Sequence, residues 1–253
     1  MFYLQFLTRV HELLRPRQYL EIGMRNGDSL ALASCPAVGI DPYYSITAEL
    51  HNTVHLYRTT SDEYFRRPDP LAPTSGQPFD LAFIDGLHLF EFAFRDFVHA
   101  EQYSAPGGVI VFDDVLPRSV AEAARERHTL GWTGDVYPML EVLARYRPEL
   151  VVLPVDTEPT GLLLVLGTDP QNTVLADHYD EIMAEFRHAD PQPVPQDVLD
   201  RMMVLPPQRV LDSPFWKLFG DARELTAPQT WRSHLAETVA GSLGRAFARA
   251  PIS

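Results

Sequence analysis

The sequence is poor in the residues that mark secreted and nucleic-acid-binding proteins. Only one of its 253 residues is a cysteine, Cys35, so no disulfide can form within the chain and a reducing compartment fits. Lysine and arginine number 21 against 34 aspartates and glutamates, which gives a formal net charge of -13. Binding a nucleic-acid backbone needs clustered positive charge, so we expect no nucleic-acid partner.

Long apolar runs are also absent. The longest strand-like run, GLLLVLG at residues 161–167, is far shorter than the ~18 residues that a membrane span needs. The first residues, MFYLQFLTRVHELL, lack a basic leader with a small-residue cleavage site, and Phe2, Phe6, Val10 and Leu13 recur at helical spacing. We therefore expect an N-terminal helix, a cytoplasmic location and no membrane partner.

Strand-like and helical patterns alternate along the first two thirds of the chain. The helical patterns cover residues 90–103, about 119–127 and about 136–146. The strand-like segments have near-continuous apolar interiors, as parallel strands buried on both faces do, and lie at residues 18–23, 36–41, 53–58, 78–85, 107–114, 150–155 and 161–167. This order predicts an α/β fold with a doubly wound, mostly parallel sheet.

The composition of the chain changes at about residue 170. Residues 188–216 are rich in proline and contain no clear strand, and helical pieces near 174–187 and 235–248 bracket them. We expect a main domain at 1–169 and a partly helical C-terminal extension at 170–253. Two roles stay open for the extension, a lid over a substrate mouth or a contact in a homodimer.

The loop after the first strand, EIGMRNGDS, has the features of a ligand-binding turn. Gly23 and Gly27 let the backbone turn tightly and approach a ligand closely, and Ser29 can cap the following helix. Asp41 ends the second strand, 20 residues after Glu21, where an acid commonly accepts hydrogen bonds from ribose hydroxyls. The sequence therefore predicts a nucleotide-like ligand at the carboxyl ends of the strands.

Two cofactor classes compete for this loop. The dinucleotide fingerprint is G-x-G-x-x-G, whereas this chain has G-x-x-x-G preceded by Glu21, whose charge a pyrophosphate would not welcome. S-adenosylmethionine carries a sulfonium and an ammonium group, which tolerate such an acid well. An ordinary α/β turn without a ligand is the remaining alternative.

The chain resembles the class I S-adenosylmethionine-dependent methyltransferases, which have a Rossmann-like fold. It is most similar to the small-molecule O-methyltransferase branch that includes the macrocin and mycinamicin O-methyltransferases, which act on macrolide sugars. The resemblance covers roughly residues 18–115 and rests on five motifs in order: LEIGMRNGDS, GIDPY, SDEYF, FDLAFIDGLH and PGGVIVFDD. One departure is that Pro36 follows Ser29 by only seven residues, so the helix after the glycine loop must be very short.

The resemblance implies a set of cofactor-binding residues. Glu21, Gly23 and Gly27 would line the methionine part of S-adenosylmethionine, Asp41 would bind its ribose, and Ser61 and Asp62 would meet the adenine edge. Arg25, Ser29 and Asp85 complete the expected set. For Asp62 a plain role as helix N-cap before EYFRR is the alternative.

Three carboxylates follow the fourth and fifth strands, namely Asp85, Asp113 and Asp114. Like charges at one place are costly unless a cation or protons neutralise them, and oxygen-only ligands favour a hard ion such as Mg²⁺. Adjacent residues on a strand point to opposite faces, so Asp113 and Asp114 can bind one ion only where the strand has ended. The alternative is a set of cofactor and capping contacts without metal.

His88 is the candidate general base. A neutral hydroxyl is a poor nucleophile, and histidine, with an unperturbed pKa of about 6.5, can take its proton near neutral pH. The resembled sugar enzymes have Asp-Gly-x-His here, with the aspartate as metal ligand and the histidine as base, and an acidic pair after the fifth strand. The first motif matches Asp85-Gly86-Leu87-His88, and the acidic pair matches Asp113-Asp114. The catechol-type metal-dependent branch typically has Asp-Asn after the fifth strand, so Asp114 favours the comparison with the sugar enzymes. A helix-start role without chemistry is the alternative for His88.

The sequence thus predicts an S-adenosylmethionine-dependent, Mg²⁺-assisted O-methyltransferase. Its acceptor would be a small hydroxylated molecule, a natural-product sugar or related metabolite. The segment at 127–138 holds Trp132 and Tyr137 between glycines, which suits an acceptor loop or a loop with buried aromatics. The rival functions are a metal-independent or nitrogen-directed methyltransferase, a nucleotide-dependent oxidoreductase and a non-catalytic cofactor-binding module.

Overall fold

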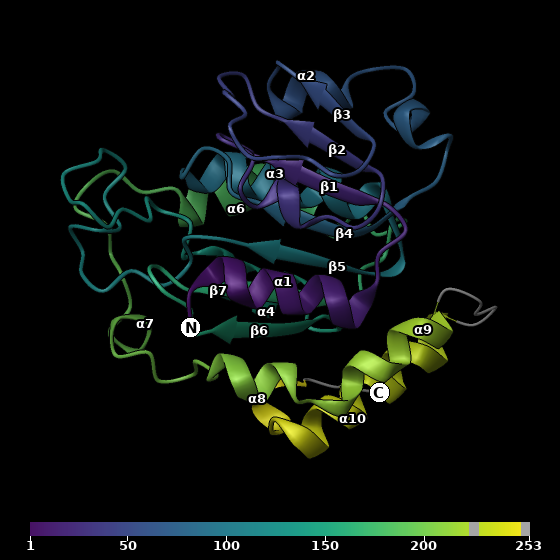
Figure 1. The fold of residues 1–253 in the computed structure, drawn as a ribbon. Helices are drawn as coiled ribbons and strands as arrows, with labels where there is room; N and C mark the ends of the chain where they lie inside the picture. Colours follow the sequence, from purple (N-terminus) through teal and green to yellow (C-terminus); the bar gives the residue numbers. More distant parts are fainter. Residues whose placement is uncertain (223–227, 249–253) are drawn as a thin grey trace.

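Seven strands form one sheet at the centre of the protein (Figure 1). The computed structural model describes residues 1–222 and 228–248. The strands run in the order β3-β2-β1-β4-β5-β7-β6, with the bounds β1 (Tyr19–Ile22), β2 (Ala37–Ile40), β3 (Val54–Tyr57), β4 (Phe79–Ile84), β5 (Ser104–Phe112), β6 (Val151–Val155) and β7 (Leu162–Leu166). Strands β1 to β5 pair in parallel, while β7 is antiparallel to both of its neighbours. The predicted doubly wound, mostly parallel sheet is confirmed.

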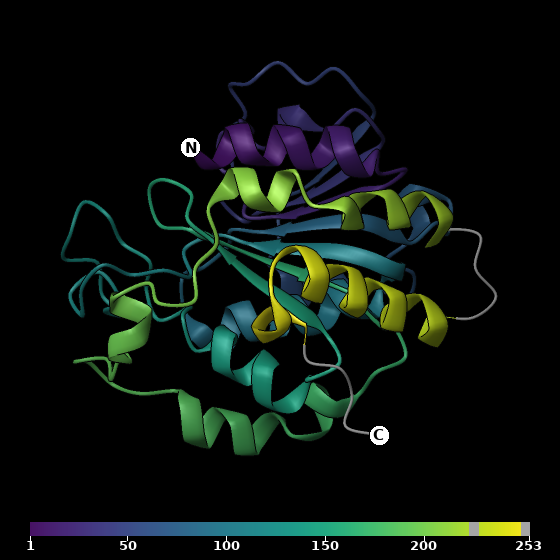
Figure 2. The same cartoon turned by 90° about the horizontal axis from the view of Figure 1, so that it is seen from below.

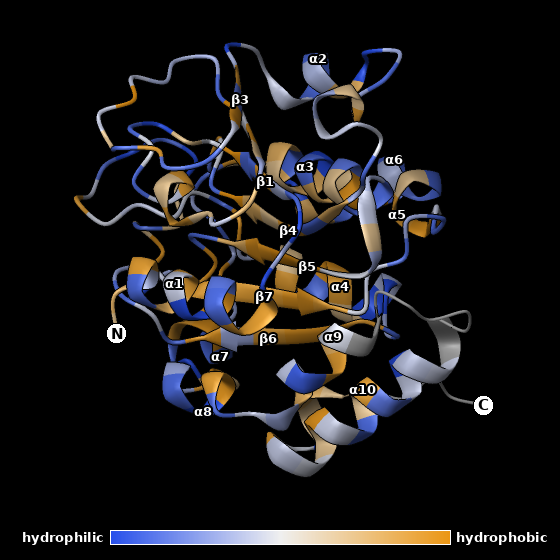
Figure 3. Ribbon diagram, turned by 45° about the vertical axis from the view of Figure 1, so that its right-hand side comes forward, coloured by the Kyte–Doolittle hydropathy of each residue, from blue (hydrophilic) through white to orange (hydrophobic). Residues whose placement is uncertain are grey.

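Successive side chains along each strand point to opposite faces of the sheet, so the core is divided into two layers. On β1, Tyr19 belongs to one buried cluster and Leu20 and Ile22 to the other. Helix α1 (Tyr3–Leu14) covers the first layer, and α3 (Phe90–Gln102) covers the second. Figure 3 shows the most hydrophobic residues gathered in β4 to β7, between these helices. Fully burying one such aliphatic or aromatic side chain stabilises the fold by roughly 1.5–3 kcal/mol.

The remaining helices have at most eight residues, apart from α10 with 15. They are α2 (Ser61–Phe65), α4 (Met139–Tyr146), α5 (Val174–Asp177), α6 (Tyr179–Phe186), α7 (Gln196–Leu199), α8 (Pro207–Leu211), α9 (Leu218–Ala222) and α10 (Pro228–Ser242), with 3-10 turns η1 (Leu30–Leu32), η2 (Ala72–Thr74), η3 (Pro214–Lys217) and η4 (Arg245–Phe247). None of the helices within the described ranges combines the length and apolar character that crossing a bilayer requires.

The predicted helix at 119–127 is wrong, because distant partners take its backbone groups. The carbonyl of Glu122 accepts from the N–H of Thr133 at 3.0 Å, and the carbonyl of Ala124 accepts from the indole of Trp132 at 2.7 Å. The N–H of Arg125 donates to the carboxylate of Asp190 at 3.1 Å. A helix would need these same groups for its own ladder, so the segment forms turns instead.

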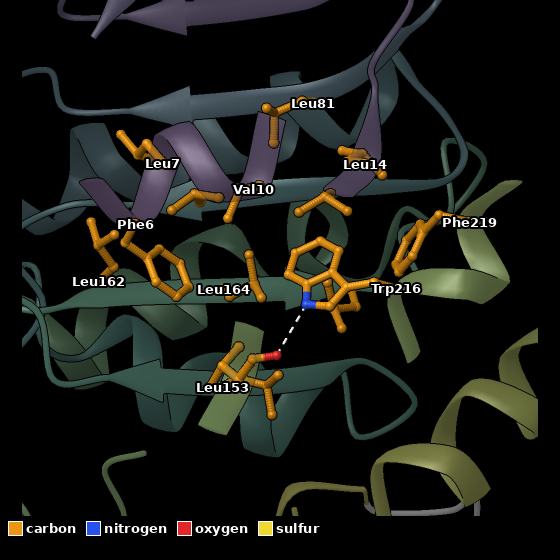
Figure 4. Close-up of a cluster of buried hydrophobic side chains, with 14 of the residues drawn as sticks. Phe6, Leu7, Val10, Leu14, Leu81, Leu153, Leu162, Leu164, Trp216 and Phe219 are labelled. Carbon is orange, nitrogen blue, oxygen red and sulfur yellow. Dashed lines mark hydrogen bonds between the residues drawn. The ribbon is translucent and has the colours of Figure 1, made fainter. Parts of the chain in front are cut away.

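The C-terminal segment shares a core with α1 (Figures 2 and 4). Phe215, Trp216 and Phe219 are buried in the cluster that contains Phe6 of α1 and strand β7, and the indole of Trp216 donates to the carbonyl of Val210 at 3.0 Å. Parts of the predicted extension, residues 223–227 and 249–253, lie outside the described residues. Its boundary at residue 169 and its roles as lid or dimer contact stay predictions.

Candidate functional site

The carboxyl ends of four neighbouring strands form one row at the left-hand end of the sheet in Figure 1. The last register partners across these strands are each followed directly by a predicted site residue: Gly23 after β1, Asp41 after β2, Asp85 after β4 and Asp113 after β5. The N–H groups of Gly23 and Asp85 donate at 2.8 Å to carbonyls of the adjacent strands, and that of Asp113 does so at 3.0 Å. The sheet therefore fixes the spacing within the row.

The glycine loop leaves the sheet in a conformation that suits glycine. Gly23 has a φ of 86°, and a Cβ on it would lie 1.9 Å from the carbonyl oxygen of Asp85. Gly27 has a φ of 87°, and its N–H closes the turn by donating to Met24 at 2.7 Å. Only the three-residue turn η1 follows the loop, as the early Pro36 predicted. The close backbone approach that the structure shows is to the chain after β4, and the approach of this loop to a ligand stays a prediction.

Glu21 lies beneath this loop and is fully buried. Its carboxylate accepts from the hydroxyl of Tyr19 at 2.7 Å and from that of Ser29 at 2.6 Å. Burial raises the pKa of Glu21 to about 8, so the group is mainly protonated at neutral pH. The prediction that Ser29 caps the following helix with its side chain is wrong, because its hydroxyl is used by Glu21 instead.

Asp41 ties the glycine loop to the end of β2. One carboxylate oxygen accepts from the N–H of Arg25 at 2.8 Å, and the other accepts from the N–H of Tyr43 at 2.6 Å. The side chain is partly exposed, and each carboxylate oxygen can accept a further hydrogen bond. Asp41 thus orders the loop and keeps free lone pairs for a ligand.

Ser61 and Asp62 lie in the first turn of α2, where their side chains face α3. Asp62 accepts three hydrogen bonds of 2.9–3.1 Å from Arg95. Burial raises the pKa of Asp62, but the Arg95 guanidinium outweighs burial and the net pKa is lowered. The alternative role of Asp62 as N-cap is wrong, because Thr60 is the N-cap and forms a capping box with Glu63. Contact of Ser61 and Asp62 with adenine stays a prediction.

Asp85, His88 and Asp114 converge beside the loop. One possible ligand atom from each lies within 4.8 Å of the others. His88 bridges the two carboxylates, with its Nδ1 3.0 Å from Asp114 and its Nε2 3.4 Å from Asp85. Asp114 has a φ of 61°, so the strand has indeed ended and the chain turns here. Positive φ at a residue other than glycine is strained, and such strain concentrates at functional sites.

Asp113 offers no ligand atom to this cluster, although it lies beside the same small hollow. It is buried, and one of its oxygens accepts from the N–H of Asp114 at 2.8 Å and lies 3.4 Å from the hydroxyl of Thr160. Burial and the neighbouring carboxylates raise its pKa well above the ordinary range. Of the three predicted metal ligands, the structure brings Asp85 and Asp114 together, and Asp113 supports the turn at Asp114.

The imidazole and the carboxylates of the cluster shift each other's pKa values. Burial lowers the pKa of His88, but Asp85 and Asp114 outweigh burial and raise the pKa to about 9. Burial raises the pKa of Asp114 to about 6 against the opposing effect of His88. In this conformation an imidazolium therefore lies between two carboxylates and offsets part of their negative charge.

The segment after β5 covers His88, and the sequence did not reveal this pairing. The Trp132 ring stacks on the imidazole with centroids 4.8 Å apart and an interplanar angle of 16°, and its carbonyl lies 3.2 Å from Nδ1. Gly134 has a φ of 56°, and a Cβ there would lie 1.7 Å from the carbonyl oxygen of His88. The sequence signal was the glycine-flanked tryptophan itself, but nothing in it named His88 as the partner.

Tyr3 is a second residue that sequence reasoning missed. It comes from α1, its ring stacks on Phe83 of β4 at 6.4 Å, and its N–H donates to Glu158 at 3.0 Å. Burial, followed by the charges of Asp85 and Asp113, raises the pKa of its hydroxyl. Tyr3 therefore approaches the same edge from the N-terminal helix.

The space beside the cluster is small. The hollow lined by Asp85, His88 and Asp114 has a volume of about 10 Å³. That is room for about one water or one ion and not for an organic acceptor.

Comparison with known proteins supports the enzyme class. Residues 20–115 match a family model described as a methyltransferase domain. This segment contains all of β1 except Tyr19, strands β2 to β5 and every predicted site residue. The prediction of a methyltransferase domain is confirmed for this part of the chain. A search of the curated proteins found no match.

Solved structures give a distant likeness. One similar structure is the O-methyltransferase TomG from Streptomyces achromogenes, which is involved in tomaymycin synthesis and was solved with SAM. It is 23% identical, the comparison covers 66% of this chain and 80% of that chain, and the TM-score is 0.48. An O-methyltransferase from Bacillus cereus, solved with SAH, is 18% identical over the same shares, with a TM-score of 0.47. Values this low assign neither a substrate nor a mechanism to this chain.

Proposed function

We propose that this protein transfers the methyl group of S-adenosylmethionine to a hydroxyl of a small molecule, a natural-product sugar or related metabolite. The observation that carries the proposal is the adjacency of two features on one sheet edge. The glycine turn at Gly23 contacts the backbone of Asp85, and Asp85 begins the cluster with His88 and Asp114. A cofactor on the turn would have its methyl group beside a base and two carboxylates.

The cofactor would lie across β1 and β2. The turn from Gly23 to Gly27 leaves the sheet at the end of β1, and Asp41 keeps lone pairs for the ribose hydroxyls. Glu21 would act from below the loop, because its oxygens are held by Tyr19 and Ser29. Its role is to hold the loop rather than to meet the ligand directly.

The cluster fits a divalent cation. Mg²⁺ is usually held by one or two carboxylates and keeps several waters, so Asp85 and Asp114 suffice without Asp113. A bound cation would neutralise the two carboxylates and acidify the acceptor hydroxyl. The nitrogen of His88 could join the ligands of a softer ion, so the identity of the metal is part of the proposal.

His88 would take the acceptor's proton. The acceptor oxygen attacks the methyl carbon in line, the C–S bond breaks, and S-adenosylhomocysteine leaves with a neutral sulfur while the hydroxyl proton passes to the imidazole. Only neutral imidazole can accept that proton. The neutral form is favoured when another positive charge compensates Asp85 and Asp114, which now hold His88 charged. Trp132 keeps the ring in place by stacking.

Calorimetric titration of S-adenosylmethionine into the purified protein tests the proposal, first with Mg²⁺ and then with excess chelator. We expect binding in both conditions, because the glycine turn and Asp41 belong to β1 and β2 while the cluster belongs to β4 and β5. Absence of binding in both would overturn the proposal, and NAD titrated in parallel tests the oxidoreductase alternative. Turnover that survives chelation would favour the metal-independent enzyme. Light scattering would report the proposed homodimer.

A further inference from the structure

A cavity of about 540 Å³ lies away from the cluster of Asp85, His88 and Asp114. It opens beside the edge strand β6, on the sheet side that α4 covers, and none of the candidate catalytic residues lines it. Small-molecule sites typically measure about 300–1,000 Å³, so the volume suits an organic ligand. Val152 and Pro154 of β6 form part of its floor.

The wall opposite the sheet is anchored at both ends. At one end Asp190 accepts from the N–H of Arg125 at 3.1 Å. At the other end Leu205 exchanges backbone hydrogen bonds with the end of β6, donating to Pro154 at 2.8 Å and accepting from Asp156 at 2.9 Å. The chain between these anchors, including α7, contributes one wall of the cavity, which stays open to solvent on another side.

The lining is apolar inside and acidic at its rim. Ala144 of α4, Phe186 of α6 and Phe247 of η4 contribute apolar surface. Its titratable members include three carboxylates, Glu141, Glu185 and Asp197, and one histidine, His188, and no lysine or arginine is among the lining residues that the structure describes.

One arginine, Arg145, interacts with two of these carboxylates. It forms an ion pair with Glu185, and the charge of Glu141 contributes to raising the pKa of its guanidinium. Glu141 and Asp197 form no ion pair with any described residue, and Asp197 only accepts from the neighbouring N–H of Val198. An anionic ligand would be repelled here, and a cationic group would be attracted.

We propose that this cavity binds an apolar small molecule that carries a protonated amine. The apolar body lies against Val152, Pro154 and Ala144, and the ammonium group lies at the rim with Glu141 and Asp197. This is a second ligand site, separate from the proposed methyl transfer. Its wall includes Leu116 and Tyr137, which come from the chain between β5 and α4, as Asp114 of the proposed catalytic cluster does.

Three probes that share one aromatic body test the proposal: 1-naphthylmethylamine, 1-naphthylmethanol and 1-naphthylacetate, titrated calorimetrically into the full chain at low ionic strength. We expect the amine to bind about ten-fold more tightly than the alcohol, since partly exposed charge pairs contribute modestly, and the anion to bind most weakly. Added salt should reduce the advantage of the amine, because it screens exposed charges. Equal affinity of all three probes would overturn the proposal.

Two variants locate the probe. Ala144→Trp fills the cavity and should abolish binding of the amine and the alcohol. The double variant Glu141→Gln/Asp197→Asn should remove the advantage of the amine and leave the alcohol unchanged, and it decides the matter should Ala144→Trp fail to fold. Glu49→Gln, an exposed carboxylate between β2 and β3, is the matched control and should change nothing. Amine binding that survives both variants would place the probe elsewhere, such as at Asp85 and Asp114, and would refute the proposal.

Discussion

Gly23 and the backbone of Asp85 approach so closely that a Cβ on Gly23 would lie 1.9 Å from the Asp85 carbonyl oxygen. The contact joins the proposed cofactor loop after β1 to the proposed metal and base cluster after β4. Both partners are held by the parallel ladder, since Asp85 donates its N–H to Ile22 at 2.8 Å. Neither side can retreat without breaking the sheet edge, so the two halves of the site are rigidly coupled.

Replacing Gly23 by alanine should therefore be costly. The positive φ alone costs an L-residue about 1–2 kcal/mol, and overpacking against fixed backbone adds typically 1–3 kcal/mol. Gly76→Ala is the matched control, because Gly76 has a similar φ of 79° but nothing within 4 Å of the added Cβ. Thermal unfolding should show a larger loss of stability for Gly23→Ala than for Gly76→Ala, together with lost S-adenosylmethionine binding. Equal losses would mean that the loop can shift.

The buried carboxyl of Glu21 should make stability fall with rising pH. Its pKa is raised from 4.5 to about 8 on folding, so the folded chain binds this proton more tightly than the unfolded chain does. Its contribution to the free energy of unfolding is complete below pH 4.5 and declines as the pH rises to about 8. The expected decline is on the order of a few kcal/mol.

Glu21→Gln should flatten this pH dependence, because the amide does not titrate. Urea unfolding at several pH values between 5 and 8 measures the slope, with the exposed Glu126→Gln as control. A variant with the slope of the unmodified protein would show that Glu21 is ionised in the fold at neutral pH.

His88→Ala should separate turnover from cofactor binding. Loss of a general base lowers the rate by typically 10²–10⁴-fold, whereas S-adenosylmethionine would contact the loop after β1 and not the imidazole. The rate is read as S-adenosylhomocysteine formed, with any acceptor that supports turnover, and affinity by calorimetry. His128→Ala, an exposed histidine of the same region, is the control. Full activity without the imidazole would remove His88 from the mechanism.

Trp132→Ala should release the imidazole from its stacked position. A stacked indole shields the protons of the ring that it covers, so the His88 ring resonances should move downfield in the NMR spectrum of the variant. Leu130→Ala, in the same segment and 97% exposed, should leave them in place. Unchanged resonances in Trp132→Ala would mean that the segment does not cover His88 in solution.

Much of the central sheet could be predicted from the sequence, because its strands depend on local patterns of apolar residues. The strands around Ile22 and Ile84 follow from short apolar runs that turn residues interrupt, and parallel order follows from the helices between them. Parallel strands end at one edge, so the glycine turn and the acid-histidine pair were expected together. The short connection before Pro36 was likewise visible in the residue count.

The helix at 119–127 failed for a reason that no local pattern contains. Its residues have adequate helical character, but the backbone of Glu122 pairs with Thr133 and that of Arg125 pairs with Asp190. Such pairings compete with helical hydrogen bonds and are decided by where the rest of the chain lies.

By itself, the sequence determined which residues reach the carboxyl edge: Gly23, Asp41, Asp85 and the pair Asp113-Asp114. Only the tertiary structure decided what their side chains do there. The positive φ of Asp114 turns its carboxylate toward His88, while the carboxylate of Asp113 accepts from the N–H of Asp114. Both carboxylates also interact with Thr160, which is distant in the chain. A side chain at a strand end takes its direction from backbone dihedrals that distant contacts impose. For that reason the residues of the site could be named from the sequence, and their partners could not.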